Sequence, residues 1–186
     1  MRIISGTLKG RSIYFLKNSN TRPLKDSVKE NIFNILKHSK YIKAKIENSN
    51  ILDLYSGIGS FGIECISRGA QKVTFIEQNT EASSILKKNL VKLSIVNKSE
   101  IINSKIENTF NGSKLKKYHI FFLDPPFSDF NFFKNIELIK KNKIFKTDHI
   151  VVIHRDKKTR DNFSNLLKVI DMKQYGRSRI IFGMFT

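Results

Sequence analysis

The sequence from Ile51 to Gly62 reads ILDLYSGIGSFG, and this stretch decides the fold. Its first five residues form a largely apolar run, and Gly57, Gly59 and Gly62 follow with the spacing G-x-G-x-x-G at the head of a predicted helix. Glycine lets the backbone turn tightly and lets a ligand approach, because it has no Cβ. Glu77 ends the next apolar run, 20 residues beyond Gly57, where a carboxylate can accept hydrogen bonds from ribose hydroxyls. The motif predicts an adenosine-containing cofactor; the alternative is a turn whose glycines only permit packing.

Apolar runs and amphipathic stretches alternate from this motif to the end of the chain. Strands are predicted at 51–55, 73–76, 100–102, 120–123, 150–154, 166–172 and 179–185, and helices at 57–68, 81–93, 132–141 and 159–167. Strands that alternate with helices form a largely parallel sheet with helices on both faces. The expected fold class is therefore α/β, with a Rossmann-like sheet.

The N-terminal part of the chain has a different pattern. Residues 2–15 alternate loosely between apolar and polar, which predicts a short β-hairpin. Pro23 opens a predicted helix, a position where its missing N–H leaves nothing unpaired, and Lys25 and Lys29 lie off the apolar stripe of that helix. The expected division is 1–48 for an N-terminal hairpin and helix extension and 49–186 for the core, together one compact unit.

An acidic residue inside the first predicted strand separates the possible cofactors. Asp53 lies within an otherwise apolar run, and a buried carboxylate needs a partner. In methyltransferases a carboxylate at this position helps to hold the cationic methionine end of S-adenosylmethionine, whereas the same strand of dinucleotide enzymes is normally apolar throughout. We therefore expect S-adenosylmethionine as the cofactor. The alternative role for Asp53 is to cap the turn that follows it.

The run FFLDPPF from Phe121 to Phe127 is the second informative motif. Two prolines directly after a predicted strand end its pairing and stiffen the loop at the carboxyl edge of the sheet, where open α/β folds bind ligands. The Asp124 carboxylate and the Pro125 carbonyl can accept the two N–H groups of an exocyclic amine, which turns its lone pair toward a methyl donor and stabilises the charge developing on nitrogen. Phe127 can stack on a base that has left its helix. The alternative is a polar turn with Phe127 in the core.

The charge of the chain is strongly positive, because 34 Lys and Arg residues against 16 Asp and Glu give a net charge of +18. Such a surface attracts polyanions, so we expect a nucleic-acid partner; the alternative is a compositional bias toward lysine. The single cysteine, Cys65, excludes an internal disulfide and favours a cytoplasmic setting. No apolar run is long enough to cross a membrane, and the four histidines lack the spacing of metal ligands, so neither a membrane nor a metal is expected.

These motifs resemble those of the RsmD-type family of bacterial methyltransferases, which modify the exocyclic N2 amine of a guanine in small-subunit (16S) ribosomal RNA. The resemblance covers essentially the whole chain. It rests on RIISG at 2–6, LKGR at 8–11, TRP at 21–23, VKENIFNIL at 28–36, LDLYSGIGSFGIE at 52–64, SRGA at 67–70, DPPF at 124–127 and YG at 175–176.

The resemblance implies a role for each matching residue. It assigns catalysis to Asp124, Pro125, Pro126 and Phe127, cofactor binding to Asp53, Ser56, Gly57, Gly59, Gly62, Glu77, Gln78 and Ser104, and RNA binding to Arg2, Lys9, Arg11, Arg22, Lys25 and Lys29. It also implies a sheet that ends in an antiparallel strand, an RNA-binding N-terminal extension, and small-subunit ribosomal RNA within an assembled or assembling particle as the substrate. We expect the protein to act as a monomer.

Some positions depart from the family pattern. Ser27 and Lys29 stand where arginines are usual, Lys105 takes the place of an Asp or Asn near the adenine, and His154 replaces a common Glu. For His154 we expect a structural or RNA-facing role. Three alternative functions remain open: a DNA adenine-N6 methyltransferase, which normally carries a separate target-recognition region, a nicotinamide-dependent oxidoreductase, and a non-catalytic RNA-binding assembly factor.

Overall fold

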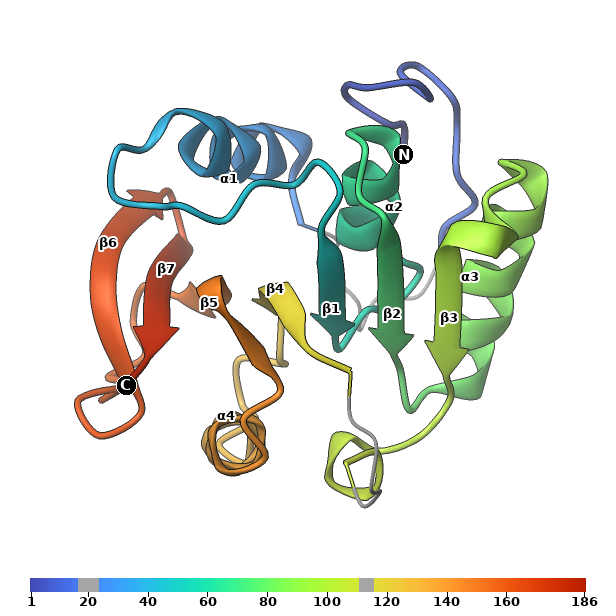
Figure 1. The fold of residues 1–186 in the computed structure, drawn as a ribbon. Helices are drawn as coiled ribbons and strands as arrows, with labels where there is room; N and C mark the ends of the chain where they lie inside the picture. Colours follow the sequence, from blue (N-terminus) through green and yellow to red (C-terminus); the bar gives the residue numbers. More distant parts are fainter. Residues whose placement is uncertain (17–23, 111–115) are drawn as a thin grey trace.

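The computed structural model describes residues 1–16, 24–110 and 116–186 of the chain. Within them, seven strands form one sheet in the order β3-β2-β1-β4-β5-β7-β6 (Figure 1). Strands β1 to β5 are parallel, whereas β7 runs antiparallel to both β5 and β6. The expected α/β, Rossmann-like sheet with antiparallel pairing at one end is therefore confirmed. In the same ranges, no helix has the length and apolar character needed to cross a membrane.

Most elements lie within three residues of their predicted ends. The strands are β1 (Asn50–Leu54), β2 (Lys72–Ile76), β3 (Ser99–Ile102), β4 (Tyr118–Leu123), β5 (Phe145–Asp156), β6 (Leu167–Tyr175) and β7 (Ser178–Phe185). The helices are α1 (Asp26–His38), α2 (Ser60–Ser67), α3 (Thr80–Lys92) and α4 (Phe132–Lys141), with short 3-10 turns at Val96–Lys98 and Ile106–Asn108. Three segments differ from the prediction, and each has a physical reason.

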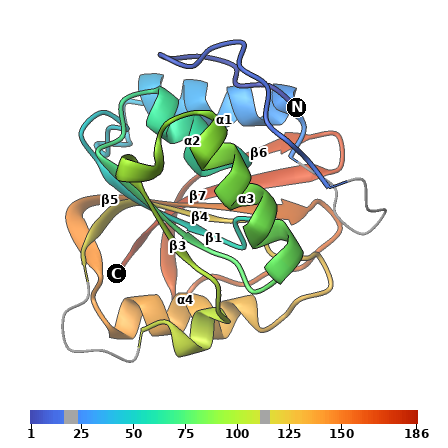
Figure 2. The ribbon, with the colours of Figure 1, turned by 90° about the vertical axis from the view of Figure 1, so that its right-hand side faces the viewer.

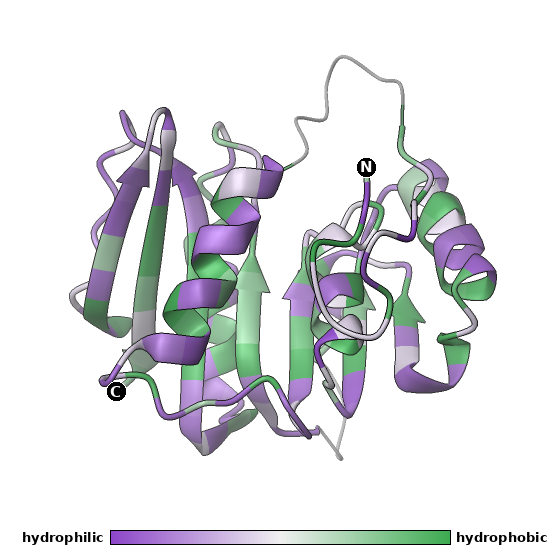
Figure 3. Cartoon of the chain, turned by 90° about the horizontal axis from the view of Figure 1, so that it is seen from above, coloured by the Kyte–Doolittle hydropathy of each residue, from purple (hydrophilic) through white to green (hydrophobic). Residues whose placement is uncertain are grey.

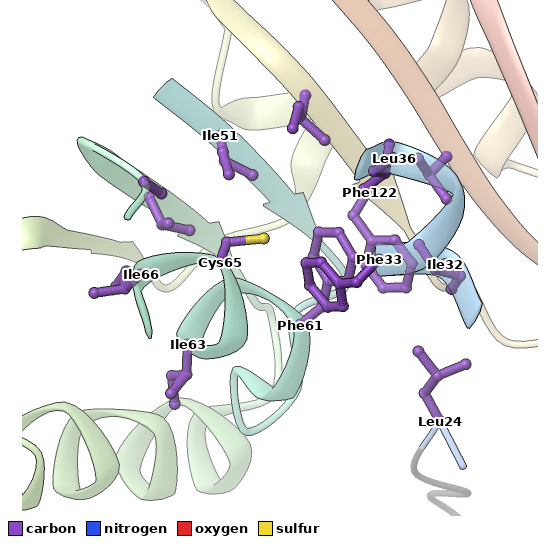
Figure 4. Close-up of a cluster of buried hydrophobic side chains, with 14 of the residues drawn as sticks. Leu24, Ile32, Phe33, Leu36, Ile51, Phe61, Ile63, Cys65, Ile66 and Phe122 are labelled. Atoms are coloured by element: carbon purple, nitrogen blue, oxygen red, sulfur yellow. The ribbon is translucent and has the colours of Figure 1, made fainter. Parts of the chain in front are cut away.

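The sheet separates two hydrophobic layers. Helices α1, α2 and α3 cover one face and α4 covers the other (Figure 2). Successive strand residues point to opposite faces, so Ile51 packs on the three-helix side and Leu52 on the α4 side. The central strands are largely hydrophobic, as burial on both faces requires (Figure 3). Rings of Phe33 in α1, Phe61 in α2 and Phe122 in β4 stack with centroid distances of 5.0 and 3.9 Å, so α1 shares the core of the sheet (Figure 4).

The N-terminal segment pairs as the predicted β-hairpin over only a short stretch. An isolated antiparallel bridge between Arg2 and Ser12, with backbone hydrogen bonds on either side of it, joins the two arms in the described residues 1–16. The next two amides of the first arm donate to the buried carboxylate of Glu64 in α2, at 2.8 and 2.9 Å. The Thr7 amide donates to the Ser67 carbonyl at the end of the same helix, at 2.8 Å. Because these donors are used on α2, the hairpin pairing does not extend to them.

The helix predicted at 159–167 is also wrong, since the chain there forms turns that lead into β6. Asp161 would lie inside that helix. Its buried carboxylate accepts hydrogen bonds from Arg155, Arg179 and the Thr159 hydroxyl. A buried charge requires such partners, and this requirement overrides the local helix propensity.

Strand β5 begins at Phe145, five residues before its predicted start at 150. The added residues Lys146, Thr147 and Asp148 are exposed, so the apolar pattern does not reveal them. The strand is 12 residues long, and its far end carries His154 and Arg155 to the carboxyl edge of the sheet.

Candidate active site

Five polar or ionisable residues lie in one row where the parallel strands end. The register places Asn103, Glu77, Tyr55, Asp124 and His154 side by side, each one residue beyond the last position at which its strand pairs with its parallel neighbour. The strand order reverses between β1 and β4, so Tyr55 and Asp124 flank the switch point, where open α/β sheets bind ligands. The glycine turn and the Asp124 loop therefore leave the sheet next to each other.

The three glycines of the turn have different surroundings. Gly57 has a φ of +54°, and a Cβ built on it would meet no atom within 4 Å. Gly59 has a φ of +84°, and a Cβ there would lie 2.3 Å from the Leu86 side chain of α3. A Cβ on Gly62 would lie 2.3 Å from the Phe75 ring of β2. A ligand can therefore approach Gly57, whereas Gly59 and Gly62 allow α2 to pack against α3 and the sheet.

Glu77 lies beside Gly57, where the sequence predicts a ribose-binding carboxylate. Its two oxygens accept the N–H groups of Gly57 and Asn79, each at 2.7 Å. Asn103, at the end of the neighbouring strand, donates its side-chain amide to the Glu77 carbonyl at 2.7 Å. Each carboxylate oxygen accepts more than one hydrogen bond, so Glu77 can also accept from a hydroxyl while it holds the turn.

Asp53 lies beneath the turn and is 1% exposed. Its carboxylate accepts the Gly62 N–H at 2.9 Å, which is the capping role that the sequence leaves as the alternative. Burial raises the pKa of the Asp53 carboxyl well above its usual range, and the Gly62 hydrogen bond offsets only part of this effect. Among the other cofactor candidates, Ser56 is nearly buried, Gln78 is exposed and Ser104 is half-buried.

The Asp124 loop, residues 124–127, is joined to β5 and β7 through a histidine. The Asp124 side chain is 25% exposed, and its Oδ1 lies 2.8 Å from Nδ1 of His154. The other ring nitrogen, Nε2, lies 2.9 Å from Oγ of Ser178. The half-buried Phe127 packs its ring edge-on against the imidazole, with centroids 5.5 Å apart. Of the two roles expected for His154, the structure favours the structural one.

Arg155 holds the backbone of the same loop from the opposite face of the sheet. Its guanidinium donates to the carbonyls of Pro126 and Phe127 at 3.2 and 3.3 Å. It also pairs with Asp161 at 3.3 Å and lies 4.2 Å from the centroid of the Phe132 ring. Of the loop prolines, Pro125 is buried and Pro126 is exposed. The loop is therefore braced by a fully buried cation.

The candidate RNA-binding residues are mostly exposed. Arg2, Lys9 and Arg11 lie on the N-terminal segment, and Lys25 lies just before α1. Arg11 donates to the Lys92 carbonyl at 3.3 Å, at the C-terminal end of α3. Arg22 lies outside the described residues.

Lys29 is not on the solvent face of α1, contrary to the expectation. It is 1% exposed, donates to Oγ of Ser60 at 3.1 Å and lies 3.4 Å from the Asp26 carboxylate. Phe33, four residues later on the same helix face, stacks on Phe61 of α2, so this face of α1 is turned toward α2. A buried, paired ammonium cannot reach an RNA phosphate, and Lys29 instead links α1 to the head of α2.

The sequence alone does not point to Tyr55, Asn103 or Arg155 as parts of the site. Tyr55 has a φ of +57°, and its hydroxyl accepts the side-chain amide of Asn135 at 2.7 Å. Burial raises the pKa of the Tyr55 phenol. Tyr55 and Asn103 end or follow predicted strands, so the strand register is the signal that could have found them.

No group of three His, Cys, Asp or Glu side chains in the described ranges could hold a metal ion, and a metal-free site stays a prediction. Cys65 is fully buried in α2, and burial raises the pKa of its thiol. It is therefore a packing residue and not a nucleophile.

The similarity of the chain to known proteins places it in one family. A family model described as "Conserved hypothetical protein 95" matches residues 1–184. The chain is 39% identical, over 84% of its length and 78% of the relative's, to ribosomal RNA small subunit methyltransferase D of Buchnera aphidicola subsp. Acyrthosiphon pisum. It is 34% identical to the protein of the same name from Haemophilus influenzae, over 84% and 79% of the two lengths. The chain belongs to the ribosomal RNA small subunit methyltransferase D family.

The three-dimensional comparison agrees with this family. The structure of "Putative methyltransferase yhhF" from Escherichia coli superposes with a TM-score of 0.82 and 26% identity, covering 100% of this chain and 97% of that one. The predicted RsmD-type resemblance is confirmed, and a methyltransferase of this family needs a methyl donor.

Proposed function

We propose that the protein transfers a methyl group from S-adenosylmethionine to the exocyclic N2 amine of a guanine in small-subunit ribosomal RNA. The observation that carries the proposal is the position of Asp124 beside Tyr55 at the switch point, which sets an amine-binding loop next to the glycine turn. The relatives named ribosomal RNA small subunit methyltransferase D support the substrate class. The guanine N2 position rests on the RsmD-type resemblance.

The residues at the glycine turn fit an adenosine-containing methyl donor. Gly57 faces open space, and the Glu77 carboxylate lies 2.7 Å from its amide, ready to accept from ribose hydroxyls. Asp53 supports the turn from below, while Gln78 and Ser104 lie on more exposed positions beside it. When bound, S-adenosylmethionine supplies an electrophilic methyl group.

The Asp124 loop, to which we assign the catalytic role, has the groups that an exocyclic amine requires. Such an amine is a poor nucleophile because its lone pair is delocalised into the base. Asp124 Oδ2, which is outside the bond to His154, and the Pro125 carbonyl can accept its two N–H groups, which frees the lone pair and stabilises the developing positive charge. Arg155 binds the two following carbonyls and so keeps the loop in one conformation, and Phe127 offers a ring for stacking on the base.

The charge of the chain supports an RNA partner. The net charge is +18, and Arg2, Lys9, Arg11 and Lys25 are exposed on or next to the N-terminal segment. Phosphate contacts of this kind position a nucleic acid without reading its sequence. We infer that this segment binds the ribosomal substrate.

Methyl transfer from labelled S-adenosylmethionine tests the proposal. The substrates are unmodified small ribosomal subunits, naked small-subunit RNA and duplex DNA. The variants are Asp124→Ala, Asp124→Asn, and the matched control Asp171→Asn on the exposed edge strand β6. We expect N2-methylguanosine in a ribosomal substrate, a loss of about 10²–10³-fold in kcat for Asp124→Ala, and little change for Asp171→Asn.

The other outcomes point to other functions. Label in DNA adenine would indicate a DNA adenine-N6 methyltransferase, and donor binding without transfer to any substrate would indicate a non-catalytic assembly factor. Asp124→Ala activity equal to that of the wild type would remove the catalytic role of the loop.

A further inference from the structure

We propose that His154 is a positioning residue, which fixes the rotamer of the Asp124 carboxylate so that Oδ2 faces the amine. This rests on the proposed function. His154 Nδ1 lies 2.8 Å from Asp124 Oδ1 and Nε2 lies 2.9 Å from Ser178 Oγ, so both ring nitrogens are held. The imidazole side chain is 7% exposed, against 25% for the carboxylate that it contacts.

The backbone alone does not set the direction of the carboxylate. Residue 123 is paired with β1 and β5, and Arg155 binds the carbonyls of Pro126 and Phe127, so the chain on both sides of Asp124 is held. The Asp124 side chain can still rotate about its own bonds when the backbone is held. A partly exposed carboxylate has several rotamers open to it, and the bond from His154 selects one of them.

The hydrogen-bond partners of His154 determine which of its ring nitrogens carries a proton. An ionised carboxylate only accepts hydrogen bonds, so Nδ1 of His154 carries a proton and donates it to Asp124 Oδ1. In a neutral imidazole Nε2 then accepts, and the Ser178 hydroxyl is its donor. The Ser178 hydroxyl therefore satisfies Nε2 in the tautomer that Asp124 selects. With Oδ1 occupied, Oδ2 is the oxygen that remains for the amine.

The position of His154 in the sheet supports this assignment. It lies opposite Asp124 in the register of β4 and β5 and on the same face of the sheet, while Arg155, the next residue, points to the other face. Two successive residues of β5 thus hold the same loop from two sides, one at its carboxylate and one at its carbonyls. Glu, common in the family at this position by the RsmD-type resemblance, has no N–H to donate.

Three variants and a matched control test the proposal kinetically. His154→Ala removes the donor, His154→Asn keeps an amide N–H within reach of Asp124, and Ser178→Ala removes the hydrogen-bond partner of Nε2. The matched control is His119→Asn, which also replaces a histidine by asparagine but at the start of β4, roughly 16 Å along the strand from Asp124. Each purified protein is checked for folding by circular dichroism, and kcat and KM are measured for S-adenosylmethionine and for small ribosomal subunits.

We expect His154→Ala to lower kcat about 10–100-fold with both KM values unchanged, because misplacing a reacting group by about 1 Å costs up to about 100-fold. His154→Asn should recover to within about threefold of the wild type, Ser178→Ala should lie between, and His119→Asn should equal the wild type. A raised KM for the ribosomal substrate with unchanged kcat would instead make His154 an RNA-contacting residue. A folded His154→Asn as inactive as His154→Ala would also overturn the proposal.

A spectroscopic readout separates this inference from the proposed function. Nitrogen-15 NMR of the imidazole should show the Nδ1-protonated tautomer in the wild type and its loss in Asp124→Ala; an Nε2-protonated wild type would overturn the inference. If the wild type methylates DNA and not ribosomal substrates, the proposed function fails. The ratios of kcat between the variants and the wild type, measured on DNA, then decide whether His154 positions Asp124. If it methylates nothing, the proposed function fails, and the catalytic role of His154 fails with it whatever the tautomer.

Discussion

The glycine turn and the Asp124 loop leave neighbouring strands at the same edge of the sheet, but they are held in different ways. The turn is held by carboxylates that accept main-chain N–H groups, Glu77 from Gly57 and Asp53 from Gly62, together with backbone conformations that glycine favours. The loop is held by side chains of β5, His154 and Arg155. The sequence motif therefore encodes most of the glycine turn, whereas the conformation of the loop depends on β5, about 30 residues further along the chain.

This difference has a consequence for substitutions. Changes at the turn act through residues of the motif itself, its glycines and the carboxylate of Asp53. The loop can also be changed through Arg155, which no motif marks. Four predictions test this contrast, from the largest expected effect to the smallest.

The largest effect is expected at Arg155. Arg155→Met keeps an apolar contact with Phe132 but removes the cation from a buried pair with Asp161, which should lower the free energy of unfolding by about 3–5 kcal/mol. Lys173→Met breaks an exposed pair with Asp171 at 3.0 Å and should cost at most about 1 kcal/mol. Urea unfolding measures both, and equal losses would mean that the loop does not depend on its buried cation.

The next effect separates two glycines of the turn. Gly59→Ala adds about 1–2 kcal/mol of backbone strain and a similar amount of overpacking against Leu86, about 2–4 kcal/mol in total. Gly57→Ala should lower stability only through the backbone strain, because its Cβ meets no protein atom. Calorimetric binding of S-adenosylmethionine should nevertheless be weakened by Gly57→Ala, since that Cβ would occupy the open face. A stable Gly59→Ala protein, or unchanged donor binding in Gly57→Ala, would contradict the division between packing and ligand approach.

A smaller effect is expected for the aromatic ring of the loop. Stacking on a base contributes about 1–3 kcal/mol, so Phe127→Ala should lower kcat/KM for the ribosomal substrate roughly 5–150-fold without loss of stability. Tyr41→Ala removes a ring that is 78% exposed and lies after α1, and should leave kcat/KM unchanged. Similar losses for both variants would show that any exposed ring contributes to binding.

The smallest effect concerns the pH dependence of stability at the turn. Burial raises the pKa of Asp53 in the folded state above its value in the unfolded chain, so the folded protein binds the extra proton between these two values. Stability should therefore fall as pH rises from the usual carboxyl range to the raised pKa, with a slope of at most about 1.4 kcal/mol per pH unit. Asp53→Asn removes this slope while its side-chain oxygen still accepts from Gly62. Unfolding curves from pH 4 upward measure both proteins, and parallel curves would contradict the burial effect.

Much of this site is predictable from the sequence because its chemistry is local. The spacing of Gly57, Glu77 and Asp124 relative to apolar runs predicts that all three follow strand ends, and the register confirms that they meet at one edge. The alternation of apolar residues likewise predicts the strands and α4 with small errors.

The failures share a different cause. The expected hairpin is short because amides of its first arm donate to α2, about 60 residues away in sequence. The helix at 159–167 is absent because Asp161 joins two arginines, and Lys29 is buried because α1 lies with that face on α2. Apart from Arg155, six residues before Asp161, these partners lie outside the window of residues that a periodicity or a motif covers.

The amino-acid sequence by itself determined the order of strands β1–β7 and helices α1–α4, the glycine turn and the place of the Asp124 loop at a strand end, because apolar periodicity and the backbone limits of glycine and proline act over a few residues. Only the tertiary structure decided which side chains hold that loop. His154 and Arg155 reach Asp124, Pro126 and Phe127 because β4 and β5 pair in one particular register, and a one-residue shift would turn each side chain to the other face of the sheet.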